Sequence, residues 1–361
     1  LDLQDFPGQG TALVGMLDAF MDSKGIITPN EWRQSCASQT IQAKMPRLVW
    51  QNNETFTANI IAINYGADAM KNQIIQWSLV AKNGSKIKEG KMDIATFKQG
   101  KITNLGDINI PLSNIKDTQQ LTFKLSTSNN TITNQYNIWV YPKIDSEESI
   151  ESIKIKSFLD DVTIAQLEKG AKVLLLPETS SIKANSVGGL FTSDYWCYPM
   201  FKGISERNKK PVSPGTLGLL IDDKHPVFNN FPTSFHSDWQ WWSIMKKSRP
   251  IILDALDEAY RPIVQPIDNF ERCSKLGLLF EFKVGKGNIL VCSTDLSDTD
   301  DFVAQQLRLS ILRYMNSEAF HPKTLITSKA LLSTIYGNLG TNANSRNTND
   351  KGNTNGYDLL N

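Results

Sequence analysis

The residues best suited to chemistry lie in one dense aromatic segment, FHSDWQWW, at positions 235–242. Aromatic rings stack on the apolar C–H faces of sugars, and Trp239 is available for such a contact. His236 and Asp238 stand between the aromatic residues and carry groups that hydrogen-bond hydroxyls. The segment therefore predicts carbohydrate contact, with His236, Asp238 and Trp239 as candidate substrate-binding residues.

The same segment has a second interpretation, in which its aromatic side chains fill an interface between domains. Trp241 and Trp242 are adjacent, and neighbouring residues cannot share one face of a helix or a strand. At least one of the two is therefore expected to pack inward. Both interpretations hold together if the segment is a loop that reaches the mouth of a substrate pocket.

A polar loop near the start of the chain is the second candidate region. Leu1 and Leu3 alternate with polar residues, as at the end of a buried strand, and a helix-periodic run follows the turn at Pro7. Asp5 and Gln9 thus stand where a strand gives way to a helix, and this rim builds the active site of α/β barrels. The alternative is a plain turn without a binding role.

The thiols and imidazoles do not suggest a metal site or a catalytic cysteine. Zinc ligands recur at short spacings such as CxxC, and this chain has no CxxC pair and only three histidines. Cys197 stands between Trp196 and Tyr198 rather than in the Gly-rich elbow of a nucleophilic cysteine. We expect no metal ligand set, no cofactor and four unpaired, buried thiols. These are Cys36, Cys197, Cys273 and Cys292.

Composition limits the class of protein. With 361 residues, 40% of them hydrophobic, the chain is long enough for two or three packed domains. Its 38 basic and 37 acidic residues leave a formal net charge of +1, so no nucleic-acid partner is expected. The apolar runs are shorter than the roughly 18–20 residues that cross a bilayer, so no membrane span is expected.

Residues 1–46 predict two helices. Apolar residues recur at helical spacing between Leu13 and Phe20 and indicate an amphipathic helix. Thr28 followed by Pro29 is typical of the start of a second, short helix, because threonine caps the first turn and proline fits its first position.

Residues 47–143 predict a β-sandwich of immunoglobulin type. Strands recur about every ten residues without helical stretches between them. Asn83-Gly84 is the strongest signal for a hairpin turn, and the alternation of Leu121 and Phe123 with polar residues indicates a half-buried strand.

Residues 151–320 predict a three-layer α/β domain of flavodoxin or glutamine-amidotransferase type. A helix ending at Gly170 precedes a continuous apolar strand, KVLLLP, which is typical of a buried parallel strand. Further strands are expected at 217–222, 250–254, 262–267, 276–285 and 287–293, with a closing helix at 298–316. Residues 321–361 predict a low-complexity, loosely held tail.

Several segments resemble one protein family. The opening LDLQDFPGQGTALVGMLDAFMDSKGIITPNEWRQSC resembles the end of the catalytic barrel in bacterial glycoside hydrolases of the family 2 type, the β-galactosidase and β-glucuronidase group. ETFTANIIAINYGA resembles the sandwich domain that follows that barrel. The C-terminal α/β domain of the same proteins is similar to FPTSFHSDWQWWSI, RPIVQPIDNF and LGLLFEFKVGKGNILVCSTDL. The resemblance covers about residues 1–316, with the opening segment and HSDWQWW its most specific parts.

This resemblance implies a C-terminal accessory region of a glycosidase that acts on β-linked glycans. Retaining glycosidases need two carboxylates, which in this group come from barrel strands that would lie upstream of Leu1. We therefore expect the catalytic residues to be absent and the chain alone to be inactive, with residues 1–46 as the end of the barrel. Asp5 and Gln9 match positions at the rim of the substrate pocket.

The resemblance also implies a carbohydrate substrate, reached through the parent enzyme, and a periplasmic or extracellular location. Association of the chain into a homo-oligomer is compatible with the resemblance. The alternative function is a carbohydrate-binding or protein-interaction module without catalysis.

Overall fold

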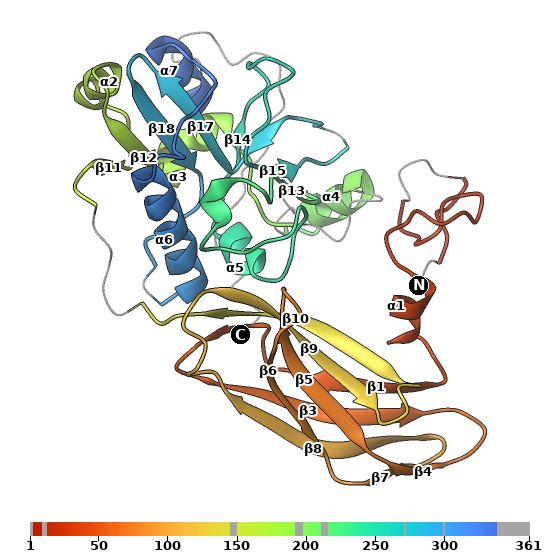
Figure 1. Ribbon diagram of the computed structural model, residues 1–361. Helices are drawn as coiled ribbons and strands as arrows, with labels where there is room; N and C mark the ends of the chain where they lie inside the picture. The colour runs from red at the N-terminus through yellow and green to blue at the C-terminus, as the bar shows by residue number, and fades with distance from the viewer. Residues whose placement is uncertain are drawn as a thin grey trace. The chain divides into compact units, whose positions relative to one another are not determined.

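The computed structural model describes residues 3–8, 13–144, 150–191, 198–210, 216–270, 272–298 and 300–337. The protein is rich in β-structure, with several separate sheets and a smaller number of helices (Figure 1). Its chain divides into two compact units. Unit 1 comprises Leu1–Pro7 and Val14–Asp145, and unit 2 comprises Gly8–Leu13 and Ser146–Asn361.

Unit 1 contains two sheets that share one core. The three-stranded sheet has the order β1 (Gln39–Lys44), β3 (Thr55–Asn64), β8 (Lys101–Pro111). The five-stranded sheet has the order β2 (Val49–Gln51), β10 (Thr133–Tyr141), β9 (Gln119–Thr127), β5 (Ile75–Ala81), β6 (Lys86–Lys91). A short pair, β4 (Met70–Gln73) and β7 (Ala95–Phe97), completes the unit.

The core of unit 1 follows from strand alternation. Phe56 and Ile60 of the first sheet belong to the same buried cluster as Leu79, Leu121 and Phe123 of the second. The two sheets therefore bury their apolar faces against each other as a sandwich. The predicted alternation in β9 is confirmed.

The predicted hairpin at Asn83-Gly84 is also confirmed. These residues join the antiparallel strands β5 and β6, and Gly84 has a φ of +85°, which favours glycine. The Gly84 N–H donates to the carbonyl of Ala81, and the Ser85 N–H donates to Oδ1 of Asn83. The turn thereby satisfies its own backbone groups.

The prediction of an amphipathic helix near the N-terminus is wrong for the described residues from Leu13 onward. Asp18 Oδ1 accepts from the N–H groups of Phe20 and Asp22, so a side chain replaces the helical backbone pattern. Met21 has a φ of +70°, which a helix excludes. As a result Phe20, expected on an apolar helix face, is 85% exposed.

The second predicted helix is confirmed as α1 (Pro29–Arg33), with a capping box between Thr28 and Glu31. Strand β1 follows at Gln39 and pairs with β3. The sandwich therefore begins before residue 47, and residues 39–44 are part of its sheet rather than of a barrel end.

Unit 2 is built on a six-stranded mixed sheet. Its order is β11 (Ile153–Lys156), β12 (Lys172–Leu175), β18 (Gly287–Cys292), β17 (Leu279–Val284), β15 (Val264–Ile267), β13 (Gly218–Ile221). The first three strands are parallel and the remaining neighbours pair antiparallel. A small pair, β14 (Ile251–Ile252) with β16 (Leu276–Gly277), accompanies the sheet.

Helices cover both faces of this sheet (Figure 1). On one face, α2 (Asp161–Glu168) and α7 (Ser328–Tyr336) contribute to a core with β12, β17 and β18. On the other face lies α6 (Phe302–Asn316), whose Tyr314 donates a hydrogen bond to the Glu281 carboxylate. Glu281 is flanked by Phe280 and Phe282 of the first face, so its side chain must point to the second.

The remaining helices are short. They are α3 (Thr179–Ile182), α4 (Tyr198–Arg207) and α5 (Trp241–Lys246), with single 3₁₀ turns at Lys183–Asn185 and Pro226–Phe228. No helix in the described ranges is long and apolar enough to cross a membrane.

The prediction of a loose tail from residue 321 is wrong for its first part. Helix α7 is capped by Thr327 and buries Leu331 and Ile335 in the core of unit 2. The Tyr336 hydroxyl also accepts a hydrogen bond from the Leu159 backbone N–H, at a sequence distance of 177 residues. Residues 338–361 lie outside the described residues.

Candidate functional site

Residues 235–242, here called the aromatic loop, lie in unit 2 around one half-buried carboxylate. Asp238 accepts hydrogen bonds from Thr233 Oγ1 (3.2 Å), from the Gln240 N–H (3.2 Å) and from Gln240 Nε2 (3.1 Å). The Ser234 N–H points at the same carboxylate from 3.4 Å. Burial raises the pKa of Asp238 to about 6, although these donors oppose the shift. Asp238 therefore fixes the shape of the loop.

The tryptophans of the aromatic loop divide between the core and the surface. Trp241 is fully buried, its Nε1 donates to Thr233 Oγ1 at 2.8 Å, and its ring meets Phe231 edge-on. Trp242 is 47% exposed, and the neighbouring Trp239 is 68% exposed. The prediction that at least one of the adjacent pair packs inward is confirmed.

The exposed rings sit on a well-ordered turn. The Trp242 N–H points to the carbonyl of Trp239 at 3.3 Å, and residues three apart on such a turn lie on the same side. Phe235 is 61% exposed, and the ring of the exposed His236 stands edge-on to it at 4.8 Å. The structure thus brings His236, Asp238 and Trp239 into one loop, with the carboxylate turned inward.

Replacing Asp238 by alanine tests this structural role. Asp238→Ala removes the acceptor that Thr233 and Gln240 share. The Gln240 backbone N–H loses its side-chain acceptor, while the Thr233 hydroxyl and Gln240 Nε2 keep the carbonyls of Ser234 and Pro232. We expect unit 2 to lose about 1–3 kcal/mol of stability, measured by denaturant unfolding. Asp223→Ala is the control, because the partly exposed Asp223 carboxylate pairs with the exposed Lys224, and such a pair contributes little. An equal, small loss in both variants would contradict the role.

Asp5, the other candidate carboxylate, lies in unit 1 and also acts within its own loop. It accepts from the Gly15 N–H at 2.9 Å and from Lys24 Nζ at 2.5 Å. The Lys24 ammonium holds the pKa of Asp5 below its usual range and also donates to the Gly15 carbonyl. Through these hydrogen bonds Asp5 links its own segment to the segments that carry Gly15 and Lys24. Gln9 lies outside the described residues, as does Cys197.

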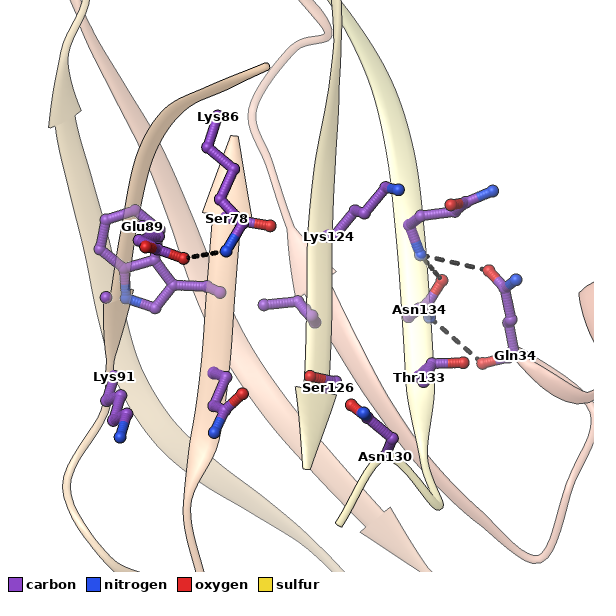
Figure 2. Close-up of a pocket in the computed structure, with 15 residues that line it drawn as sticks. Gln34, Ser78, Lys86, Glu89, Lys91, Lys124, Ser126, Asn130, Thr133 and Asn134 are labelled. Atoms are coloured by element: carbon purple, nitrogen blue, oxygen red, sulfur yellow. Dashed lines mark hydrogen bonds and ion pairs between the residues drawn. The ribbon is translucent and has the colours of Figure 1, made fainter. Parts of the chain in front are cut away.

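A second candidate surface was not predicted from the sequence. Four neighbouring strands, β6, β5, β9 and β10, line a hollow of about 610 Å³ on unit 1 (Figure 2), here called the sheet groove. Cross-strand register brings Gln76 beside Ser126 and Ser78 beside Lys124. Glu89 stands opposite Ser78 and forms an ion pair with Lys86 at 2.6 Å. The groove is therefore lined by hydroxyl, amide and ammonium groups.

One edge of the sheet groove is held by the segment that follows α1. Gln34 Oε1 accepts from the Gln135 N–H at 3.2 Å, and Asn134 Nδ2 donates to the Gln34 carbonyl at the same distance (Figure 2). Asn134 also donates to the Ile41 carbonyl at 2.8 Å. Alternating polar residues on the strands were visible in the sequence, but strand order and register were not, so the groove was missed.

The cysteines are only partly as predicted. Cys36, Cys273 and Cys292 are free thiols, but Cys36 and Cys273 are exposed, so the prediction of buried thiols is wrong for them. Cys292 is fully buried, and burial raises its pKa to about 12, which makes it unreactive at neutral pH. Within the part of the chain that the structure describes, no cluster of three or more His, Cys, Asp or Glu could hold a metal ion.

Comparisons with known proteins give little functional information. No curated protein matches the chain. Among solved structures, a CARDB domain from Pyrococcus furiosus, solved in complex with di-metal ions, is 12% identical with a TM-score of 0.23, covering 29% of this chain and 94% of that one. Spo0M, a sporulation control protein from Bacillus subtilis, is 10% identical with a TM-score of 0.23, covering 29% of this chain and 50% of that one.

Two family models match the chain itself. The domain of unknown function DUF8488 matches residues 54–142, within unit 1. The domain of unknown function DUF8487 matches residues 154–336, within unit 2 and over more than half of the chain. The chain therefore belongs to the DUF8487 family.

Proposed function

We propose that this chain is a non-catalytic carbohydrate-binding region of a glycoside hydrolase of the family 2 type, acting on β-linked glycans. In this proposal the catalytic carboxylates come from another part of the enzyme. The observation that carries it is the exposure of Phe235, Trp239 and Trp242 on a loop whose shape is fixed by the half-buried carboxylate of Asp238.

Exposed rings of this kind suit sugar recognition. Trp241 already supplies the apolar anchor that the loop needs, so Trp239 and Trp242 are not required for packing. A ring held on a rigid turn loses little conformational freedom when a sugar stacks on it. The Nδ1 atom of the exposed His236 contacts the Ser237 carbonyl at 3.0 Å, and its Nε2 can hydrogen-bond a sugar hydroxyl beside this surface.

The sheet groove supports the same class of function less strongly. Its strand β6 stands at the edge of the five-stranded sheet and carries Lys86, Lys88 and Lys91. Lysines on an edge strand hinder its pairing with strands of other sheets. Part of the positive charge of the groove is therefore explained without a ligand, so the groove supports carbohydrate binding less strongly than the aromatic loop does.

The finer architecture belongs to the same proposal. We infer an immunoglobulin-like sandwich for unit 1, supported by two sheets around one core in which all neighbouring strands except β2 and β10 pair antiparallel. For unit 2 we infer a flavodoxin-like or amidotransferase-like domain, supported by helices on both faces of a sheet with three parallel strands. A periplasmic or extracellular location and a possible homo-oligomer follow from the family resemblance alone.

A protein-interaction module is the second candidate function. The same exposed rings would then be covered by another domain of the parent enzyme, because Trp and Phe are common anchors of interfaces. Oligosaccharide binding to the isolated chain distinguishes the two functions.

The test is a titration of the chain with β-linked galacto-, manno-, xylo- and gluco-oligosaccharides, followed by tryptophan fluorescence. We expect saturable quenching with at least one of them, and we expect Trp239→Ala to weaken it roughly tenfold, equivalent to about 1.4 kcal/mol. Trp32→Ala is the matched control, because Trp32 is a partly exposed tryptophan on α1 of unit 1. Quenching that is absent, or lost equally in both variants, would contradict carbohydrate binding at the aromatic loop.

A further inference from the structure

A second cavity lies in unit 2, away from the loop-fixing carboxylate of the aromatic loop. It has a volume of about 470 Å³, within the range of small-molecule sites. Three segments that each follow a parallel strand line it: 155–157 at the end of β11, 176–179 after β12, and 293–297 after β18. We call it the strand-end crevice.

The topology of unit 2 accounts for this crevice. Strands β12 and β18 are neighbours and run parallel. After β12 the chain enters α3, whose Ile182 joins the core on the face of α2 and α7. After β18 the chain enters α6, which lies on the opposite face, where Tyr314 meets Glu281. The two connections diverge and leave a gap between them, which is the place where open α/β sheets bind ligands.

Basic side chains converge on the strand-end crevice. Four of its lining residues are cations and two are acids; the cations are Lys156, Lys247, Arg249 and Arg308, and the acids are Glu178 and Asp295. Lys247 forms ion pairs with Asp298 at 2.5 Å and with Asp301 at 3.4 Å, so it is already compensated. A guanidinium group presents several donors in one plane, so Arg249 and Arg308 are the main anion-binding candidates.

Arg249 and Arg308 are both half-buried and come from different elements. Arg249 precedes β14, its N–H donates to the Ser293 carbonyl, and its Nη2 donates to the Ser186 carbonyl at 3.3 Å. Arg308 projects from α6. A guanidinium carries five donors in a planar fork, so it can bind a carboxylate or a phosphate while it keeps another partner.

The remaining lining residues narrow the class of ligand. Ser157 and Thr179 add hydroxyl donors, and Ile155, Leu176 and Leu296 supply an apolar wall. None of the described lining residues is aromatic, so the crevice offers no ring on which a nucleobase could stack. None of the described lining residues is a histidine or a cysteine.

We propose that the strand-end crevice binds a small organic anion, whose phosphate or carboxylate group is held by Arg249 and Arg308. The carbon part of the ligand lies against the apolar wall, and the hydroxyl groups of Ser157 and Thr179 complete the contacts. This site is independent of the carbohydrate surface proposed above.

The experiment uses the full chain with inorganic phosphate and with citrate as probes, at constant ionic strength. Backbone amide shifts in NMR spectra should saturate and should be confined to residues 155–157, 176–179 and 293–297. A response to phosphate alone identifies a phosphate site, and a response to citrate alone identifies a carboxylate site; both support anion binding. Shifts that do not saturate, or that spread evenly over surface lysines, overturn the proposal.

Variants then assign the binding to the guanidinium groups. Arg308→Gln should weaken anion binding roughly tenfold, because a hydrogen bond to a charged group is lost. Arg313→Gln is the matched control: Arg313 lies on the same helix, is exposed and bonds Asn230 outside the crevice. Equal weakening in both variants overturns the assignment. If Arg308→Gln does not fold, Arg249→Gln is tested in its place. The map of amide shifts in the unaltered chain tests the location of the anion site without any variant.

Discussion

Glu281→Gln should stabilise unit 2 relative to the unaltered chain as the pH rises, by about 3 kcal/mol between roughly pH 5 and pH 9. Burial raises the pKa of Glu281 to about 7, while the Tyr314 hydroxyl donates to its carboxylate at 2.8 Å. The folded state therefore keeps this proton to higher pH than the unfolded state, whose carboxyl has an ordinary pKa of 4.5. The stability is complete below that ordinary pKa and is lost as the pH rises through about 7.

His225 shapes the lower part of this pH profile. Its Nε2 lies 3.9 Å from Glu281 Oε1, and burial lowers its pKa, so its contribution to stability grows as the pH rises toward its ordinary value of 6.5. Below pH 6.5 the titrations of His225 and Glu281 change the stability in opposite directions. Above that pH only the titration of Glu281 still changes it. Tyr260 also faces this region, through a hydrogen bond from its hydroxyl to the Glu281 carbonyl.

The measurement is denaturant unfolding of unit 2 across this pH range. Glu318→Gln is the control, because Glu318 is an exposed carboxylate just beyond α6. The difference between Glu281→Gln and the unaltered chain should widen between about pH 4.5 and about pH 7 and then level off, and the control should show no such trend. A constant difference would mean that folding does not shift the pKa of Glu281.

Leu331→Ala should destabilise unit 2 by about 2–5 kcal/mol. Leu331 is fully buried on α7, in one cluster with Val173, Ile289 and Ile335. The substitution removes apolar contacts and leaves a cavity that a packed core fills only in part. Denaturant unfolding measures the loss.

Lys329→Ala provides the comparison for α7, because Lys329 is exposed two residues away on the same helix. Alanine keeps the helix propensity there, so the effect should stay within roughly 0.5 kcal/mol. If Leu331→Ala cost no more than Lys329→Ala, α7 would not be part of the core. Loss of the transition in unit 1 would show that the effect is not local.

The sequence was most informative where a local pattern alone determines the structure. The Asn83-Gly84 hairpin, the Thr28 cap of α1 and the alternation in β9 all depend on neighbouring residues, and all were predicted. The first predicted helix failed because Asp18 satisfies two backbone N–H groups through its side chain, which an apolar spacing does not reveal.

Long-range partners account for the other differences. Helix α7 was assigned to the tail because a segment of polar, low-complexity composition follows it, yet the Tyr336 hydroxyl accepts a hydrogen bond from Leu159 on a distant segment. Asp5 matched a pocket rim in sequence, but its partner Lys24 lies 19 residues away and engages it within the loop. The sheet groove and the strand-end crevice depend on strand order, which periodicity does not encode.

The divergent exits of β12 and β18 have an evolutionary consequence. The strand-end crevice exists because two neighbouring strands send their chains to opposite faces, so connectivity creates it and no particular side chain is required. Some lining residues, such as Ile182, also belong to the core, whereas Arg308 does not. If the crevice binds a ligand, we expect lining residues outside the core, such as Arg308, to be replaceable without loss of the scaffold.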